Sequence, residues 1–109
     1  MGELRARMRA DLARAMRDRD APRVKVLRTT LAAIENAEAV EGVSSVQGVV
    51  GCQDVSRRVL DDQEIVGILS READGWTESV AEYQRIGQMA RADGLQRELE
   101  ILQGYLSDR

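Results

Sequence analysis

Apolar residues recur at three- and four-residue spacing in four separate segments of this 109-residue chain. That spacing places them along one side of an α-helix and leaves the opposite side polar. The segments cover residues 4–17, 20–38, 61–86 and a last stretch that starts between residues 90 and 93. Because a one-sided helix must bury its apolar side against another element, the pattern predicts an all-α fold, a small four-helix bundle.

Each predicted helix contributes its own stripe to the core. The four stripes are Leu4, Met8, Leu12, Ala15 and Met16; Val24, Leu27, Leu31 and Ile34; Ile65, Leu69, Ala73, Trp76, Val80 and Tyr83; and Leu95, Leu99, Leu102 and Leu106. Aromatic residues make up only 3% of the chain, so the predicted core is almost entirely aliphatic.

Capping residues mark where these helices begin and end. Asp20 is suited to cap the second helix, whose first turn tolerates Pro22. Asp61 followed by Glu64 has the spacing of a capping box at the start of the third helix. Gly87 is placed to end that helix in a left-handed conformation.

The helical pattern stops between Val40 and Leu60. Gly42, Gly48 and Gly51 alternate there with valines, which predicts a Gly/Val-rich loop or a small β-hairpin at about residues 40–60. Cys52 lies in this segment. We expect it to be a small apolar filler, because the chain has no histidine to activate a thiol.

The residue types needed for common active sites are missing. Without histidine the chain lacks the usual general base and nitrogen metal ligand, and no phosphate-binding glycine loop is present. Glu38 lies one turn beyond Ile34 on the apolar line, so we expect its carboxylate either at a wet helix end or paired with an arginine of a neighbouring helix. The sequence therefore predicts no catalytic residue, no metal and no cofactor.

Positive charge is concentrated near the amino terminus. Residues 1–30 carry nine Arg or Lys against four Asp or Glu, whereas the remainder is strongly acidic and brings the net charge to −3. Five cations surround the junction of the first two helices: Arg14, Arg17, Arg23, Lys25 and Arg28. They form a candidate nucleic-acid site, because phosphate contacts require only such groups. The alternative is that these arginines pair with the acidic helices of the same domain.

Several strings in this order resemble the YqeY family, whose fold also forms the tail domain of the B subunit of glutamine-dependent tRNA amidotransferases. The likeness rests on the helix at residues 4–20, on the helix that starts at Arg23 and ends in Asn36-Ala37-Glu38, and on Leu60-Asp61-Asp62-Gln63-Glu64-Ile65. It continues through Glu72, Glu78–Tyr83 and Gly87 to the ending Glu98-Leu99-Glu100-Ile101-Leu102-Gln103-Gly104-Tyr105-Leu106. On this resemblance Asn36, Glu38, Asp61 and Glu64 belong to the family's structural motif.

The chain departs from the family pattern at three places. Trp76 and Thr77 stand where such proteins often carry basic residues, Gln88 follows Gly87 where an arginine is common, and the segment at residues 40–60 is longer than the usual turn. Family members also usually continue with a second, three-helix subdomain. We therefore expect residues 1–109 to form a single domain that corresponds to the first subdomain, with the second one absent.

The resemblance implies a non-catalytic helical protein that binds tRNA weakly or acts as an adaptor for an amidotransferase-type complex. The family is grouped with amidotransferase-type carbon–nitrogen ligases through this shared domain, although these residues supply no active site for that reaction. The alternative is a protein-interaction or self-associating module without a nucleic-acid role. A single cysteine suggests a reducing compartment, so we expect a cytoplasmic protein, and no apolar run is long enough to make a membrane its partner.

Overall fold

The computed structural model describes residues 2–44 and 59–107, with side chains throughout these ranges except at residues 40–44. Four helices follow one another along the chain: α1 (Glu3–Asp18), α2 (Ala21–Ser44), α3 (Asp62–Arg85) and α4 (Met89–Ser107). No strand occurs within the described ranges. The predicted all-α bundle is confirmed.

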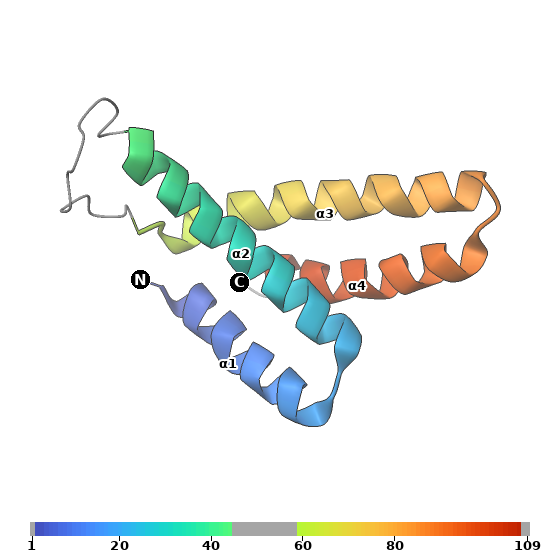
Figure 1. Ribbon diagram of the computed structural model, residues 1–109, viewed down its shortest axis with the longest axis horizontal. Coiled ribbons are helices and arrows are strands. Elements are labelled where there is room, and N and C mark those ends of the chain that lie inside the picture. Colours follow the sequence, from blue (N-terminus) through green and yellow to red (C-terminus); the bar gives the residue numbers. More distant parts are fainter. Residues whose placement is uncertain (1, 45–58, 108–109) are drawn as a thin grey trace.

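The helices are arranged as two hairpins (Figure 1). α1 packs along α2, and α4 packs along α3, where the contact is the most extensive in the molecule. α2 crosses the second hairpin and touches both of its helices, as the diagonal ribbon in Figure 1 shows. Because α2 is covered by α1 on one side and by the α3–α4 hairpin on another, it is the central element of the core.

The core is aliphatic, as the composition predicts, and every helix contributes to it. Its buried members are Leu4, Met8, Val26, Leu27, Leu31, Ile34, Leu60, Ile65, Ile68, Leu69, Ala73, Leu99, Leu102 and Tyr105. The predicted stripe of α2 is too narrow, since Val26 and Thr30 are also fully buried. The Thr30 hydroxyl donates to the carbonyl oxygen of Val26 at 2.8 Å, so this buried polar group is satisfied within its own helix.

Two further sequence expectations, one in α1 and one at the end of α2, differ from the structure. Met16, assigned to the buried stripe of α1, is 49% exposed, because it lies near the end of the helix, where α1 approaches the turn to α2. Residues 40–44, assigned to the loop, continue α2 to Ser44. A helix interior tolerates a residue such as Gly42 at a cost of only about 1 kcal/mol. The loop or hairpin predicted further along, including Cys52, falls on residues 45–58, outside the described residues.

The helix ends follow the predicted capping chemistry. The Asp20 carboxylate accepts from the backbone N–H of Arg23 at 3.3 Å. At α3 the capping box is complete, because the Asp61 carboxylate accepts from the Glu64 N–H at 2.8 Å and the Glu64 carboxylate accepts from the Asp61 N–H at 3.1 Å. Gly87 ends this helix with a positive φ of 81°, a conformation that glycine adopts without steric penalty.

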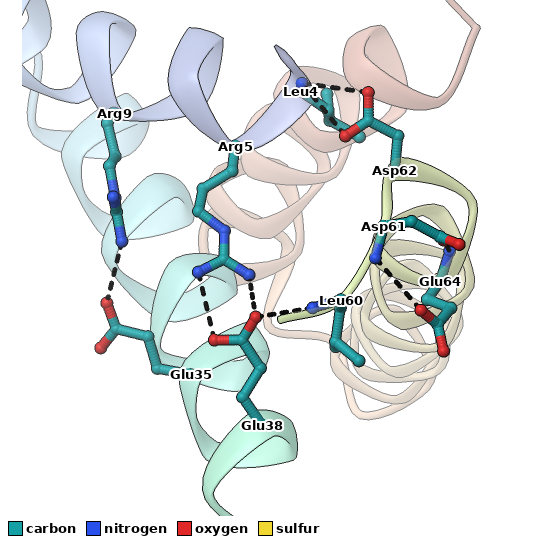
Figure 2. A network of polar contacts seen from close by, with 9 residues as sticks. All are labelled: Leu4, Arg5, Arg9, Glu35, Glu38, Leu60, Asp61, Asp62 and Glu64. Atoms are coloured by element: carbon teal, nitrogen blue, oxygen red, sulfur yellow. Dashed lines mark hydrogen bonds and ion pairs between the residues drawn. The ribbon is translucent and has the colours of Figure 1, made fainter. Parts of the chain in front are cut away.

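A buried carboxylate joins three segments at one end of the bundle (Figure 2). Glu38 of α2 is only 2% exposed, and the guanidinium of Arg5 in α1 donates to both of its oxygens. Glu38 also accepts from the backbone N–H of Leu60 at 2.9 Å, just before α3 begins. Of the two alternatives for Glu38, the pair with an arginine is the one observed. Asn36, two residues earlier, is exposed.

The same end of the bundle carries two further links between helices. The Asp62 carboxylate accepts from the Leu4 backbone N–H at 3.3 Å, which satisfies a donor that the first turn of α1 leaves free. Arg9 and Glu35 form an ion pair at 3.8 Å one turn away from the buried pair, with both side chains more than half exposed. Figure 2 shows these contacts converging from α1, α2 and the start of α3.

The ion pairs Arg5–Glu38 and Arg9–Glu35 between α1 and α2 allow a direct comparison of buried and exposed charge. Glu38→Ala leaves the Arg5 guanidinium and the Leu60 N–H without their acceptor, so we expect it to lower the free energy of unfolding by about 3 kcal/mol or more. Glu35→Ala removes an exposed pair on the same helix, and we expect a loss below about 1 kcal/mol. Urea unfolding followed by far-ultraviolet circular dichroism measures both. Equal losses would contradict the central role of Glu38.

Candidate nucleic-acid interface

The turn between α1 and α2 brings an arginine into a position that favours glycine. Arg19 has a φ of 56° and a ψ of 39°, in the left-handed region. Its N–H donates to the carbonyl oxygen of Met16 at 3.3 Å, and the N–H of Asp20 donates to that of Ala15 at 2.9 Å, so α1 ends in a Schellman-type turn. This conformation costs an L-residue about 1 kcal/mol, which a glycine would avoid.

Beside this turn lies an open hollow of about 640 Å³, which we name the basic hollow. Its charged wall consists of Arg19, Lys25 and Arg28. Met16, Ala21, Val24 and Thr29 form the rest of its lining. Three cations around a partly apolar floor suit an anionic ligand that also offers some apolar surface.

The structure divides the five cations predicted from the sequence. Lys25 and Arg28 line the basic hollow, whereas Arg14 and Arg23 line a smaller hollow of about 180 Å³. Arg17 lies in the last turn of α1 and lines neither of these two hollows. Sequence analysis missed Arg19, because nothing in a sequence reveals that a non-glycine residue has a positive φ.

Some of these cations are already paired. Arg23 Nε lies 3.3 Å from Asp20 Oδ2, and Lys25 Nζ lies 3.2 Å from Glu98 Oε1 of α4. The expectation that basic residues pair with later acidic helices therefore holds for Lys25. In the described ranges, neither Arg14, Arg17 nor Arg19 forms an ion pair. Arg28 likewise has no ion pair in these ranges, and its guanidinium lies 3.9 Å from Met16 Sδ. These four guanidinium groups give the surface its uncompensated positive charge.

The smaller hollow combines the two arginines with carboxylates. Asp11, Asp18 and Asp20 line it together with Arg14 and Arg23. Within the described residues no group of three or more acidic, histidine or cysteine side chains is arranged to hold a metal ion. In this hollow at the α1–α2 junction, the positive charges of the two arginines are therefore balanced by carboxylates.

Asp11 has a structural partner in α4. The phenol of buried Tyr105 donates to Asp11 Oδ2, and the Arg7 guanidinium lies 4.9 Å from the centre of the Tyr105 ring. Burial, followed by the hydrogen bond to Asp11, raises the pKa of Tyr105 above its ordinary value of 10.0. The bond to Glu38 likewise raises the pKa of Arg5. Both shifts move away from neutral pH, as expected for groups that hold helices together.

A third hollow, of about 360 Å³, lies where α2, α3 and α4 meet, and we name it the aromatic hollow. Trp76 lines it, and the indole N–H donates to Glu98 Oε1 at 3.1 Å. The remaining lining residues are Thr29, Arg71, Glu72, Gly75, Ser79 and Leu95. Leu95 and Trp76 were predicted as core residues, and both are only partly buried.

Comparison with known proteins identifies the family. The family model described as Yqey-like protein (YqeY) matches residues 5–109. The chain belongs to the YqeY family. No curated protein and no solved structure matches it significantly. Among the described helices of this YqeY protein, none combines the length and the apolar character that a bilayer span requires.

The raised pKa of Tyr105 has a consequence for stability at alkaline pH. The unfolded chain loses the phenolic proton before the folded one does, so the stabilisation is complete below about pH 10 and is lost as the pH rises further. We expect Tyr105→Phe to lower the free energy of unfolding by about 1–2 kcal/mol at pH 8, and this difference to shrink above pH 10. Denaturant unfolding at several pH values measures it, with Tyr83→Phe as the control. A difference that does not change with pH would contradict this role of Tyr105.

Proposed function

We propose that this YqeY protein is a non-catalytic helical adaptor that binds the phosphate backbone of RNA weakly, with tRNA as the RNA that the family resemblance suggests. The basic hollow and the neighbouring Arg14 and Arg17 form the binding surface. An amidotransferase-type complex is the assembly in which such an adaptor would serve. The proposal includes no catalytic step, since the chain has no histidine and its basic side chains suit binding.

The observation that carries the proposal is the backbone of Arg19. A glycine at this position would form the same turn without the steric penalty of a positive φ. The arginine instead adds a third cation beside Lys25 and Arg28 in the basic hollow. Strained backbone positions of this kind are concentrated at binding and catalytic sites, because the ligand benefits from a side chain that the fold alone does not need.

Charge distribution supports a directional contact. Residues 1–30 are positive, whereas the rest of the chain is negative, so a polyanion is attracted to α1 and the start of α2 and repelled elsewhere. Each phosphate contact releases counterions from the RNA, and the affinity then falls as salt rises. We therefore expect binding that is weak at physiological salt and strongly salt-dependent.

Arg19→Gly should change RNA affinity and stability in opposite directions, so the two effects can be told apart. Relief of the left-handed strain should raise the free energy of unfolding by about 0.5–1 kcal/mol. Loss of one cation should weaken tRNA binding on the order of fivefold at low salt. Thermal unfolding and fluorescence anisotropy with labelled tRNA measure the two effects. A more stable variant with unchanged affinity would show that Arg19 does not contact RNA.

A triple variant tests the whole surface. Arg14/Arg17/Arg28→Ala should reduce the slope of log affinity against log salt by about 2 to 3, because each phosphate contact contributes close to one unit. Arg85/Arg91/Arg97→Ala removes the same charge from the α3–α4 hairpin and is the matched control. If both variants bind tRNA like the wild type, or lose affinity equally, the proposed surface is wrong.

The alternative function, a self-associating or protein-binding module, is favoured by one observation. Ile86 and Met89, on either side of the turn between α3 and α4, are each 52% exposed. On this alternative the wild type sediments as a concentration-dependent dimer, and Ile86→Ser/Met89→Ser sediments as a monomer. If the wild type remains monomeric at all concentrations tested, the protein does not self-associate and that part of the alternative function is wrong.

A further inference from the structure

The basic hollow and the aromatic hollow are neighbours on one surface. Thr29 of α2 is exposed and lines both of them. Lys25, one turn before Thr29, belongs to the basic hollow and pairs with Glu98, the carboxylate that also holds the Trp76 indole. A continuous surface therefore runs from the α1–α2 turn across α2 to α3 and α4.

Trp76 is held firmly in this surface. It is the only tryptophan of the chain, and part of it packs against the core. Its N–H edge is fixed by Glu98, whose side chain is 12% exposed and whose charge is balanced by Lys25. An indole that is fixed on one edge and open to a hollow is a rigid apolar surface, the kind on which nucleic-acid bases stack.

Gly75 keeps the hollow beside the indole open. It lies in the interior of α3, where glycine costs about 1 kcal/mol relative to alanine. A Cβ atom added at Gly75 would meet no atom within 4 Å beyond its chain neighbours and the adjacent helix backbone, so packing does not require glycine here. A side chain at this position would instead extend into the aromatic hollow, which Gly75 lines.

We propose that the two hollows form one track for a single-stranded RNA segment, with an unpaired base against Trp76 and phosphates beside Arg19, Lys25 and Arg28. Arg71 adds a cation at the aromatic end, whereas Glu72 repels phosphates from the same hollow. The base and the phosphates are thereby directed to different parts of the track. Bases of a duplex are stacked on one another, so only an unpaired base can contact the indole. The inference rests on the proposed function and specifies the kind of RNA bound.

Two RNA probes of equal phosphate number distinguish the inference from the proposed function. An unstructured oligouridylate can place a base against Trp76, whereas a blunt RNA duplex can contact only the cations. Because Trp76 is the only tryptophan, its fluorescence reports directly on the aromatic hollow. We expect the oligouridylate to quench this fluorescence and to bind more tightly than the duplex, and the duplex to bind without quenching.

Gly75→Gln fills the hollow without harming the helix, so a loss of binding cannot be attributed to unfolding. We expect it to weaken oligouridylate binding about fivefold or more and to leave duplex binding unchanged. Gly67→Gln is the matched control, because Gly67 is also in α3, also has open space around it and does not line the aromatic hollow. Gly67→Gln should gain the same helix stability as Gly75→Gln, and it should bind both probes like the wild type.

The outcomes separate the two proposals. If both probes bind with a salt dependence but the oligouridylate neither quenches Trp76 nor responds to Gly75→Gln, the single-strand track is wrong and the phosphate-binding function stands. Equal weakening by Gly75→Gln and Gly67→Gln likewise overturns the track. If neither probe binds at low salt, both the track and the proposed function fall.

Discussion

The buried carboxylate of Glu38 is the interaction on which the arrangement of the helices depends. Its two oxygens accept from the Arg5 guanidinium of α1 and from the backbone N–H that precedes α3, so one side chain of α2 positions both neighbours. Such a charge is costly to bury unless every acceptor position is used, and here the partners come from segments far apart in sequence. The apolar contacts between the helices supply most of the stability, but they are not directional. The ion pair adds a directional contact that favours the observed register over others that bury similar apolar area.

This register has consequences at the opposite end of the α1–α2 hairpin. Arg5 and Arg9 are engaged by α2 near the start of the chain, whereas Arg14, Arg17 and Arg19 near the turn are left for solvent or a ligand. α2 then crosses the α3–α4 hairpin at an angle, and the space beside the crossing forms the aromatic hollow, which meets the basic hollow of the α1–α2 turn at Thr29. The ion pair between Lys25 and Glu98 links α2 to α4 at this crossing, and Glu98 also orients the Trp76 indole through a hydrogen bond. The surface that we propose for RNA binding thus arises from the same packing that builds the core.

Much of the fold follows from local patterns. The four helices, the capping box at Asp61 and the glycine at position 87 were predictable, because helix periodicity and capping act over a few residues. The end of α2 was misplaced, since a preference against Gly42 is weak compared with the continuity of a helix. The candidate site was predicted only in part. Lys25 and Arg28 were named and lie together, whereas Arg19 and the aromatic hollow were missed because they depend on backbone conformation and on the crossing of distant helices.

The sequence by itself determined which segments are helical, which faces are apolar, and that positive charge is concentrated in the first thirty residues. These properties are local or additive, so they can be derived without coordinates. The tertiary structure decided that Glu38 pairs with Arg5, that four of the five predicted cations divide between two hollows, and that Trp76 lies beside an open space next to Lys25. Each of these depends on the angle and register at which helices pack. Many registers bury similar apolar area, and only the complete set of contacts selects one of them.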